Sequence, residues 1–437
     1  MNPELRRHLW LELNPQRLVL MPLVLVVLFV LAYRLGGDAW QPVGSLAATA
    51  FVLLTVLWGG RRVHFDVLQE VEGQTWDSQR MSALGAWRLT WGKLLGAPVY
   101  SWYGGLLCLG VYAVVTFGRL PAAWALRNLA LLVLAALFVH GLALFGALLS
   151  VRNRASEGVR RSSALALFGL LILALLMTVA SPLDVPRTIE WYGYGLSQQR
   201  FALLSLIAWS GWLVYGAYRL IRIEQGYENG PLGWVLFMLF CALWLTGLLP
   251  PVPEIEAVDV SAWLPRLGGA FVVCTALTYV ALFTGDKRLV TLSQTWSLLR
   301  GGQWRRGLHV MPRWLPAYGV TLPAALWLTS ELSRLPWAGG LAWMPVTAMV
   351  FMLRDVFLVL WLHADPRRRH AASTALALLV LGYLLIPALL SLAGWTAVLP
   401  AFLPRHDGGL VGLALAVAET TAVAWALAAR GELRSGA

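Results

Sequence analysis

The sequence predicts an all-α polytopic membrane protein with about twelve transmembrane helices. Hydrophobic residues make up 59% of the chain and charged residues 13%, and the mean hydropathy is +0.67. These values lie far from those of soluble domains. Apolar runs long enough to cross a bilayer recur along the whole length. No hydrophilic stretch between them is long enough to form a sizeable soluble domain.

The chain is expected to begin with a short amphipathic helix over residues 2–13, lying on the cytoplasmic surface. Asn2 can cap this helix, Pro3 suits its first turn, and Asn14-Pro15 ends it. A basic flank without such a helix is the alternative. The apolar face of the helix is predicted from residues at helical spacing: Leu5, Leu9 and Leu13, with Trp10 beside them.

The transmembrane helices are predicted from the apolar runs. In the first half they lie at 17–35, 42–60, 94–117, 126–150, 164–182 and 201–222. In the second half they lie at 232–249, 266–284, 316–332, 341–362, 372–393 and 409–428. The run 316–332 is the least regular, because Pro316 and Pro323 interrupt it and Glu331 closes it.

The net charge of +12 comes almost entirely from arginine, since Lys93 and Lys287 are the only lysines. Basic residues concentrate in the N-terminus, the even-numbered connections and the C-terminus, whereas outer connections carry acids such as Glu254, Glu256 and Asp259. This bias follows the positive-inside rule and predicts that both termini are cytoplasmic. The charge is therefore expected to contact the lipid bilayer, and no nucleic-acid partner is predicted.

The two halves of the chain are predicted to be related. In each half, two spans precede a long basic cytoplasmic segment, at 61–93 and at 285–315. Both segments contain Gln-Thr-Trp, first at 74–76 and again at 294–296. Chance similarity between two loops with similar roles is the alternative. The predicted organisation is an N-terminal interfacial helix followed by two parallel six-span halves: 1–16, 17–223 and 224–437.

The segment 61–96 has an unusual order of charged and aromatic residues. Acidic residues come first and basic residues follow, over the stretch from Asp66 to Lys93. Such a mixture at helical spacing predicts a helix that lies along the membrane surface or docks into the groove of a partner. An interfacial helix that only joins two spans is the alternative. The apolar residues close to one helix face are Trp76, Met81, Leu84, Trp87 and Trp91.

This segment resembles the signature of type-2 ABC exporter membrane subunits. In that family an acidic residue, a Gly-Thr pair, an apolar run, a Thr-Pro-Leu-like turn and a closing Gly-Lys follow the second span. Here Gln74 replaces the usual Gly and Ala83 replaces the usual Pro. The residues that match, without a gap, are Glu70, Thr75, Trp76-Asp77, Leu84 and Gly92-Lys93.

The resemblance implies that the segment is a coupling helix, which receives motion from a separate cytoplasmic ATPase. It implies a permease subunit in a bacterial inner membrane, working as a homodimer or as one internally duplicated chain. In the second case 285–315 would be a degenerate second coupling segment, because it lacks the acid-x4-Thr spacing. The residues that would couple to the ATPase are Glu70, Thr75, Trp76, Leu84, Gly92 and Lys93.

The sequence shows no motif for nucleotide chemistry or catalysis. It has no Gly-x-x-x-x-Gly-Lys-Ser/Thr phosphate loop and no His-Glu-x-x-His pair. Cys108, Cys241 and Cys274 lie inside apolar runs without metal-ligand spacing and are expected to pack as small hydrophobic residues. His140 lies inside a span, where a packing role is more typical than ligation. We therefore predict a transporter subunit rather than an enzyme, with no cofactor and no metal site.

Ionisable residues are also predicted at membrane depth, where charges are costly and usually face protein or water. Arg354 and Asp355 adjoin near the cytoplasmic end of one span, and Glu419 lies near the middle of the last. Because neighbouring residues point away from each other on a helix, Arg354 and Asp355 are expected to pair with other residues. We interpret these residues as structural ties between helices, with a translocation path as the alternative.

Other classes of function stay open. An ion-coupled secondary transporter would need functional charges inside its spans and no docked ATPase. An integral membrane enzyme acting on lipid-linked substrates would need a catalytic cluster, and none is visible in the sequence. An ATPase gene with a phosphate loop beside this one would favour the exporter.

Overall fold

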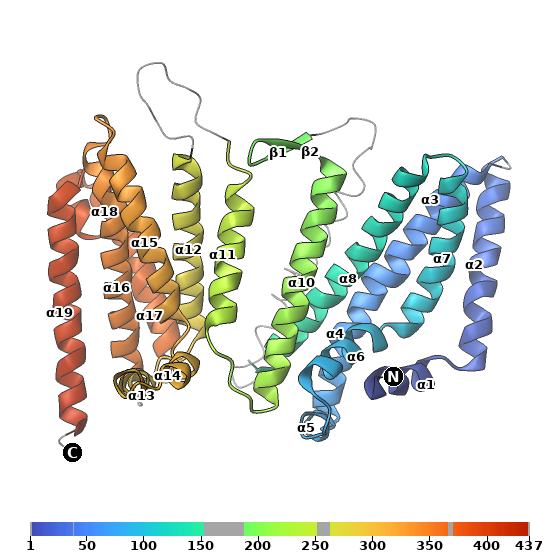
Figure 1. Ribbon diagram of the computed structural model, residues 1–437, viewed down its shortest axis with the longest axis horizontal. Coiled ribbons are helices and arrows are strands. Elements are labelled where there is room, and N and C mark those ends of the chain that lie inside the picture. Colours follow the sequence, from blue (N-terminus) through green and yellow to red (C-terminus); the bar gives the residue numbers. More distant parts are fainter. Residues whose placement is uncertain (1, 38, 153–187, 251–262, 366–369, 436–437) are drawn as a thin grey trace. The chain divides into compact units, whose positions relative to one another are not determined.

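The computed structural model describes residues 2–37, 39–152, 188–250, 263–365 and 370–435. The chain forms two compact units, and each is described here by itself. Unit 1 comprises Met1–Thr188 and Leu196–Asn229, and unit 2 comprises Ile189–Gly195 and Gly230–Ala437. Figure 1 labels the elements. The predicted kinship of the two halves stays a prediction.

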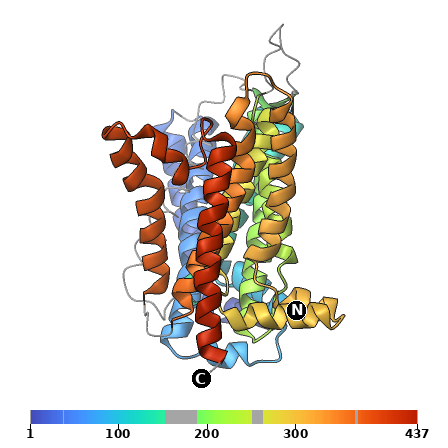
Figure 2. The ribbon, with the colours of Figure 1, turned by 90° about the vertical axis from the view of Figure 1, so that its left-hand side faces the viewer.

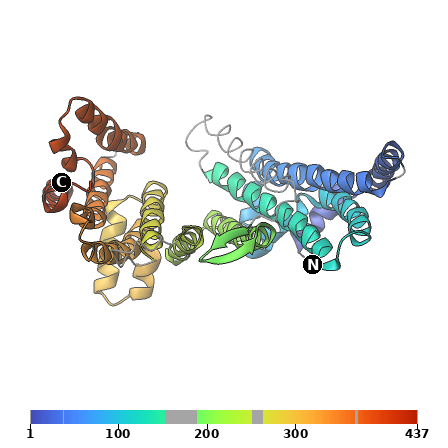
Figure 3. The ribbon, with the colours of Figure 1, turned by 90° about the horizontal axis from the view of Figure 1, so that it is seen from above.

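The described part of unit 1 is built from helices around two apolar clusters. One cluster surrounds Leu89 and Ile221 and joins α4 and α6 to α8 and α10; the other surrounds Phe51. Seen from above, α8 is tilted relative to α2 (Figure 3). The elements are α1 (Pro3–Glu12), α2 (Pro15–Leu35), α3 (Trp40–Phe51), η1 (Val52–Trp58), α4 (Gly59–Glu72), α5 (Trp76–Arg80), α6 (Ala86–Gly96), α7 (Val99–Phe117), α8 (Ala122–Arg152) and α10 (Gln198–Glu224).

Unit 2 is also helical. Strands β1 (Thr188–Trp191) and β2 (Tyr194–Ser197) form a small hairpin before α10, and residues 189–195 of this hairpin belong to unit 2. Figure 2 shows α13 and α14 lying across the ends of the long helices, and the α17–α18 helix standing apart from its neighbours at its upper end. The helices are α11 (Leu232–Thr246), α12 (Leu264–Thr284), α13 (Leu289–Arg300), α14 (Trp304–Val310), α15 (Trp314–Ser333), η3 (Gly339–Trp343), α16 (Met344–His363), α17 (Ala371–Val380), η4 (Leu381–Leu385), α18 (Ile386–Leu392), η5 (Thr396–Ala401) and α19 (Gly409–Ser435).

In the described part of the chain, 9 helices are long and apolar enough to cross a membrane. The prediction of an all-α polytopic membrane protein is confirmed to that extent, and the finer count of about twelve stays a prediction. The predicted span 42–60 is part of a longer helix of 33 residues, Trp40–Glu72, which α3, η1 and α4 form without a break. α11 has only 15 residues. The predicted span 164–182 lies outside the described residues.

Helix α1 forms as predicted, and it buries its polar face against the rest of unit 1. The Asn2 side chain accepts a hydrogen bond from the Glu4 amide, and Pro3 occupies the first turn. The buried residues of α1 are Glu4 and His8, while Trp10 on the predicted apolar face is exposed. The polar face is buried because it meets charged side chains of α4 and α6, which periodicity within one helix cannot reveal.

The segment after the long helix differs from the predicted single helix over 76–91. Residues 81–85 break it into α5 and α6. The break divides the predicted apolar stripe, because Trp76 is buried in the core of unit 1 with 4% of its surface exposed, whereas Met81 and Trp87 are 81% and 50% exposed. The stripe therefore has an inward-facing and an outward-facing part.

The Gln-Thr-Trp tripeptide occupies different structures in the two basic segments. At 74–76 it links α4 to α5, and Gln74 adopts a positive φ of 57°. At 294–296 it lies inside α13, where Thr295 is buried and Trp296 is exposed. The shared letters therefore do not mark equivalent structural positions.

Candidate functional site

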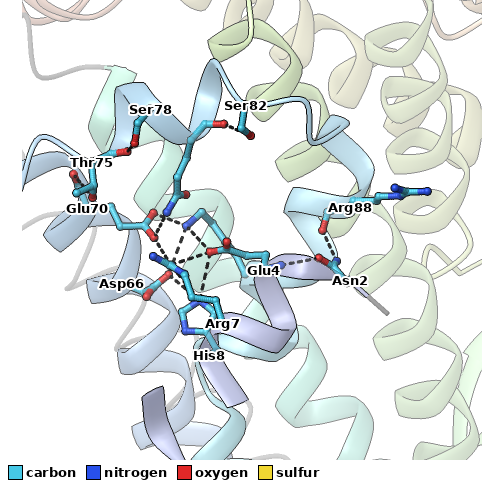
Figure 4. A network of polar contacts seen from close by, with 12 residues as sticks. Asn2, Glu4, Arg7, His8, Asp66, Glu70, Thr75, Ser78, Ser82 and Arg88 are labelled. Atoms are coloured by element: carbon cyan, nitrogen blue, oxygen red, sulfur yellow. Dashed lines mark hydrogen bonds and ion pairs between the residues drawn. The ribbon is translucent and has the colours of Figure 1, made fainter. Parts of the chain in front are cut away.

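The most extensive polar site of unit 1 joins α1 to α4, α5 and α6. Figure 4 shows the side chains of Glu4, Arg7 and Glu70 pointing into one cluster. The site brings the N-terminus together with the segment that was predicted to couple to a partner. We call it the N-terminal network, and its members are Glu4, Arg7, His8, Asp66, Glu70, Gln79 and Lys93.

Lys93 lies at the centre of the N-terminal network, with 0% of its surface exposed. Its Nζ donates a hydrogen bond to Glu70 Oε2, and lies 3.5 Å from Asp66 Oδ2 and 3.7 Å from Glu4 Oε1. The centre of the Trp76 ring is 5.4 Å from Nζ, a cation–π distance. These carboxylates compensate the burial of the Lys93 ammonium group inside the unit.

Glu70 ties the segment together through both its side chain and its main chain. Its Oε2 accepts the bond from Lys93, while Oε1 accepts hydrogen bonds of 2.6 Å from Arg7 Nη2 and of 2.6 Å from Gln79 Nε2. Its main-chain carbonyl accepts hydrogen bonds from the N–H and the Oγ1 of Thr75, at 2.9 Å and 3.2 Å. One residue therefore connects α1, α4, α5 and α6.

Two glycines allow α1 to lie close against α6. A Cβ added to Gly92 would be 2.5 Å from Glu4 Cβ, and one added to Gly96 would be 2.6 Å from His8 Cδ2. Both distances are too short for packed carbon atoms, so a larger side chain at either position would displace α1. The small residue in the Gly-Lys pair thus has a packing role in this fold.

The N-terminal network stabilises the ionised form of the Glu4 carboxyl. His8 Nε2 lies 3.4 Å from Glu4 Oε1 and 3.8 Å from Asp66 Oδ2. Burial raises the pKa of the Glu4 carboxyl, but the hydrogen bond with His8 and the charges of Lys93 and Arg7 outweigh burial and lower this pKa to about 2. At neutral pH the Glu4 carboxylate therefore favours the docked position of α1.

The predicted coupling residues fall into an inner and an outer group. Thr75 is exposed, and Leu84 is half-buried, with its carbonyl accepting a 2.8 Å hydrogen bond from Gln225 Nε2. With Met81 and Trp87, Thr75 forms the outward-facing part of the segment. The inner group, buried in unit 1, is Glu70, Trp76, Gly92 and Lys93.

Unit 2 contains a second polar site, the Arg354 cluster, made of Arg354, Asp355, Glu419, Tyr279 and Tyr383. Arg354 Nη1 donates to Glu419 Oε2 at 2.6 Å, and Arg354 Nε and Nη2 donate to Asp355 Oδ1 at 3.1 Å and 3.0 Å. The hydroxyls of Tyr279 and Tyr383 each donate to Asp355 Oδ2 at 2.6 Å. The cluster thus connects α12, α16, η4 and α19 inside the predicted spans.

The Arg354 cluster corrects one sequence expectation. Arg354 and Asp355 were expected to point away from each other and to pair with other residues. Both have such partners, but the long Arg354 side chain also folds back and bonds Asp355. The Cζ of Arg354 lies 4.5 Å from the centre of the Phe351 ring. The sequence analysis missed Tyr279 and Tyr383, because a tyrosine hydroxyl inside an apolar run does not stand out from a packing aromatic.

His140 is buried beside the π-helical turn η1 of unit 1. Its Nε2 lies 2.7 Å from the carbonyl oxygen of Thr55. The centres of the His140 and Trp102 rings are 5.5 Å apart, in an edge-to-face arrangement. A π-turn changes the backbone ladder of a helix and is common where side chains approach it. These contacts support a packing role for His140. Within the described ranges, no group of three or more His, Cys, Asp or Glu is placed to hold a metal ion.

The sequence analysis missed α1 as part of the site. Glu4, Arg7 and His8 recur at spacings of one helix turn, which is the signal that could have revealed their common face. Comparison with known proteins found no matching protein family, no matching curated protein and no matching solved structure. Function is therefore argued from residues and contacts alone.

Proposed function

We propose that the chain is the membrane-spanning permease subunit of an ATP-driven exporter that resembles the type-2 ABC family, in a bacterial inner membrane with both termini cytoplasmic. The multi-pass helical architecture and the positive-inside bias support this proposal. A separate cytoplasmic ATPase supplies the energy, since the chain has no phosphate loop.

The contact between Glu70 and Lys93 carries the proposal. Glu70 and Lys93 match the acidic residue and the closing lysine of the family's pattern. The Lys93 ammonium donates a buried hydrogen bond to the Glu70 carboxylate. Gln74 departs from the family's Gly, yet its φ of 57° lies in the left-handed region that glycine favours. The left-handed turn at Gln74 and the buried bond between Glu70 and Lys93 support the proposal.

The proposed coupling follows from how α6 is held. The ATPase docks on the outward-facing residues Thr75, Met81 and Trp87, and its closure pushes on α5 and α6. Because Lys93 fixes α6 to α4 and α1, these helices move together. α6 is followed after Ala97 and Pro98 by α7, so the displacement reaches a transmembrane helix. The buried charges hold the segment rigid, and the exposed apolar residues provide the surface that the ATPase binds.

Co-purification from the native membrane tests the docking surface. We expect a phosphate-loop ATPase to be recovered with the wild-type protein and to be lost with the double variant Met81→Gln, Trp87→Gln. Met81 is 81% exposed, and Trp87 is 50% exposed with ring contacts to Trp91 and Tyr218, so neither change removes a fully buried side chain. Trp40→Gln is the matched control, because Trp40 is 57% exposed and lies at the far end of the helix Trp40–Glu72, which precedes the docking residues in the chain.

The outcome decides between two classes of transporter. Recovery of an ATPase with wild type and with Trp40→Gln, but not with the double variant, supports the exporter. Absence of an ATPase from every sample overturns it. The second candidate, an ion-coupled secondary transporter, is then favoured, because the Arg354 cluster supplies charged groups inside the spans of unit 2.

A further inference from the structure

Within the Arg354 cluster, Arg354 and Asp355 form an ion pair in which both carboxylate oxygens of Asp355 accept hydrogen bonds. Asp355 is completely buried. Its Oδ1 accepts hydrogen bonds from two N–H groups of Arg354, and its Oδ2 accepts from the hydroxyls of Tyr279 and Tyr383. Four donors on one carboxylate favour its ionised form. The charges of Arg354 and Asp355 therefore cancel within the cluster.

Glu419 adds a negative charge that the pair of Arg354 and Asp355 leaves without a second cation. Its Oε2 accepts the hydrogen bond from Arg354 Nη1, its Oε1 has no hydrogen bond within the described part of the chain, and its side chain is 36% exposed. Among the described elements, α16, η3 and η5 pack on α19. Helix α16 carries Arg354 and Asp355, and neither η3 nor η5 contains an ionisable residue. The nearest base along α19 is Arg430, about 16 Å away at 1.5 Å per residue.

Glu419 also lies at the depth where a surplus charge costs most. The apolar stretch of α19 runs from Gly409 to Arg430, and Glu419 is at its middle. The helical rise places it about 15 Å from each end, which is the centre of a hydrocarbon layer about 30 Å thick. A carboxylate in such a position is disfavoured unless a positive charge joins it.

We propose that Glu419 is the binding group for a monovalent cation, either a proton or an alkali metal ion, at mid-membrane. Arg354 holds one oxygen of Glu419 and Asp355 holds Arg354, so the second oxygen of Glu419 has a fixed position from which to bind. Tyr383 reaches the cluster from the π-helical turn η4, a distortion that is frequent at functional sites. The proposal concerns unit 2 alone and does not rest on an ATPase docking on unit 1.

Modification by a hydrophobic carbodiimide tests this proposal on the full-length protein. Carbodiimides react with protonated carboxyl groups in apolar surroundings. The wild-type protein, in nanodiscs of uncharged lipid, is treated over a range of pH and in sodium, potassium or choline chloride at equal ionic strength. Mass spectrometry then gives the extent of modification at Glu419. Asp355 is the internal control, because its side chain is completely buried and has no surface that the reagent can reach.

The results separate the two sources of positive charge. For a proton, modification depends on pH and is the same in all three salts. For a metal ion, sodium or potassium chloride protects Glu419 and choline chloride does not. No modification under any condition, or modification independent of both pH and cation, overturns the proposal. All these measurements use wild type, so they do not depend on whether a variant folds.

Discussion

The N-terminal network and the Arg354 cluster bury charges of opposite sign in the same manner. In unit 1 the buried ion is the ammonium of Lys93, which faces the carboxylates of three residues. In unit 2 it is the carboxylate of Asp355, which faces one guanidinium and two hydroxyls. A buried ion requires several opposite or polar partners, because water no longer solvates it. The two sites differ in what lies at their edge.

The difference distinguishes a site that holds helices together from a site that can bind and release a cation. The edge of the N-terminal network is made by Arg7 and His8 of α1, whose position the glycines of α6 determine. The edge of the Arg354 cluster is Glu419, a partly exposed carboxylate with one bonded oxygen. We infer that the first site holds helices in place, whereas the second can gain and lose a cation. The predictions below test this contrast.

Removing the central cation of the N-terminal network should have the largest effect. Lys93→Met leaves the carboxylates of Glu4, Asp66 and Glu70 without their shared partner, and we expect a loss of about 3–5 kcal/mol of stability. Thermal unfolding of the purified protein measures this loss. Trypsin cleavage after Arg7 should also become faster, because α1 is released from α6.

The other lysine of the chain provides a matched control for Lys93→Met. Within the described residues, Lys287 Nζ donates only to main-chain carbonyls, those of Phe283 at 2.8 Å and of Gly285 at 3.2 Å. Lys287→Met should therefore cost about 1 kcal/mol or less. Equal losses for the two variants would contradict the fastening role of the N-terminal network.

In the Arg354 cluster, the two acids should differ in their contribution to stability. Asp355→Asn removes the only buried anion that faces Arg354, and we expect a loss of about 3 kcal/mol. Glu419→Gln keeps an acceptor for Arg354 Nη1 and removes the surplus charge, so its effect should stay within about 1 kcal/mol. Thermal unfolding of both variants beside wild type is the measurement. A larger loss for Glu419→Gln would mean that Glu419 is the main counter-ion of Arg354, and would count against cation exchange there.

The sequence predicted the features that depend on local physics. Apolar runs predicted the long helices, and Asn2 with Pro3 predicted the start of α1, because capping acts within one turn. Both charged sites instead join residues far apart in the chain, such as Arg7 with Glu70 and Arg354 with Glu419. A single sequence gives the composition of each helix face but not which faces meet. The sequence therefore predicted a role for Lys93 but not that Glu4, Arg7 and His8 of α1 would join its site.

The smallest predicted effect is the pH dependence of the Glu4 contribution. The pKa of Glu4 is lowered from its ordinary value of 4.5 to about 2 in the folded protein. The native state therefore favours the ionised form, and this stabilisation is complete above pH 4.5 and lost as pH falls toward 2. Comparison of thermal unfolding for wild type and Glu4→Gln isolates this term. We expect wild type to lose about 1 kcal/mol relative to the variant between about pH 7 and pH 4. A pH-independent difference would show that Glu4 contributes through packing, and the fastening role would then rest on Lys93, Asp66 and Glu70.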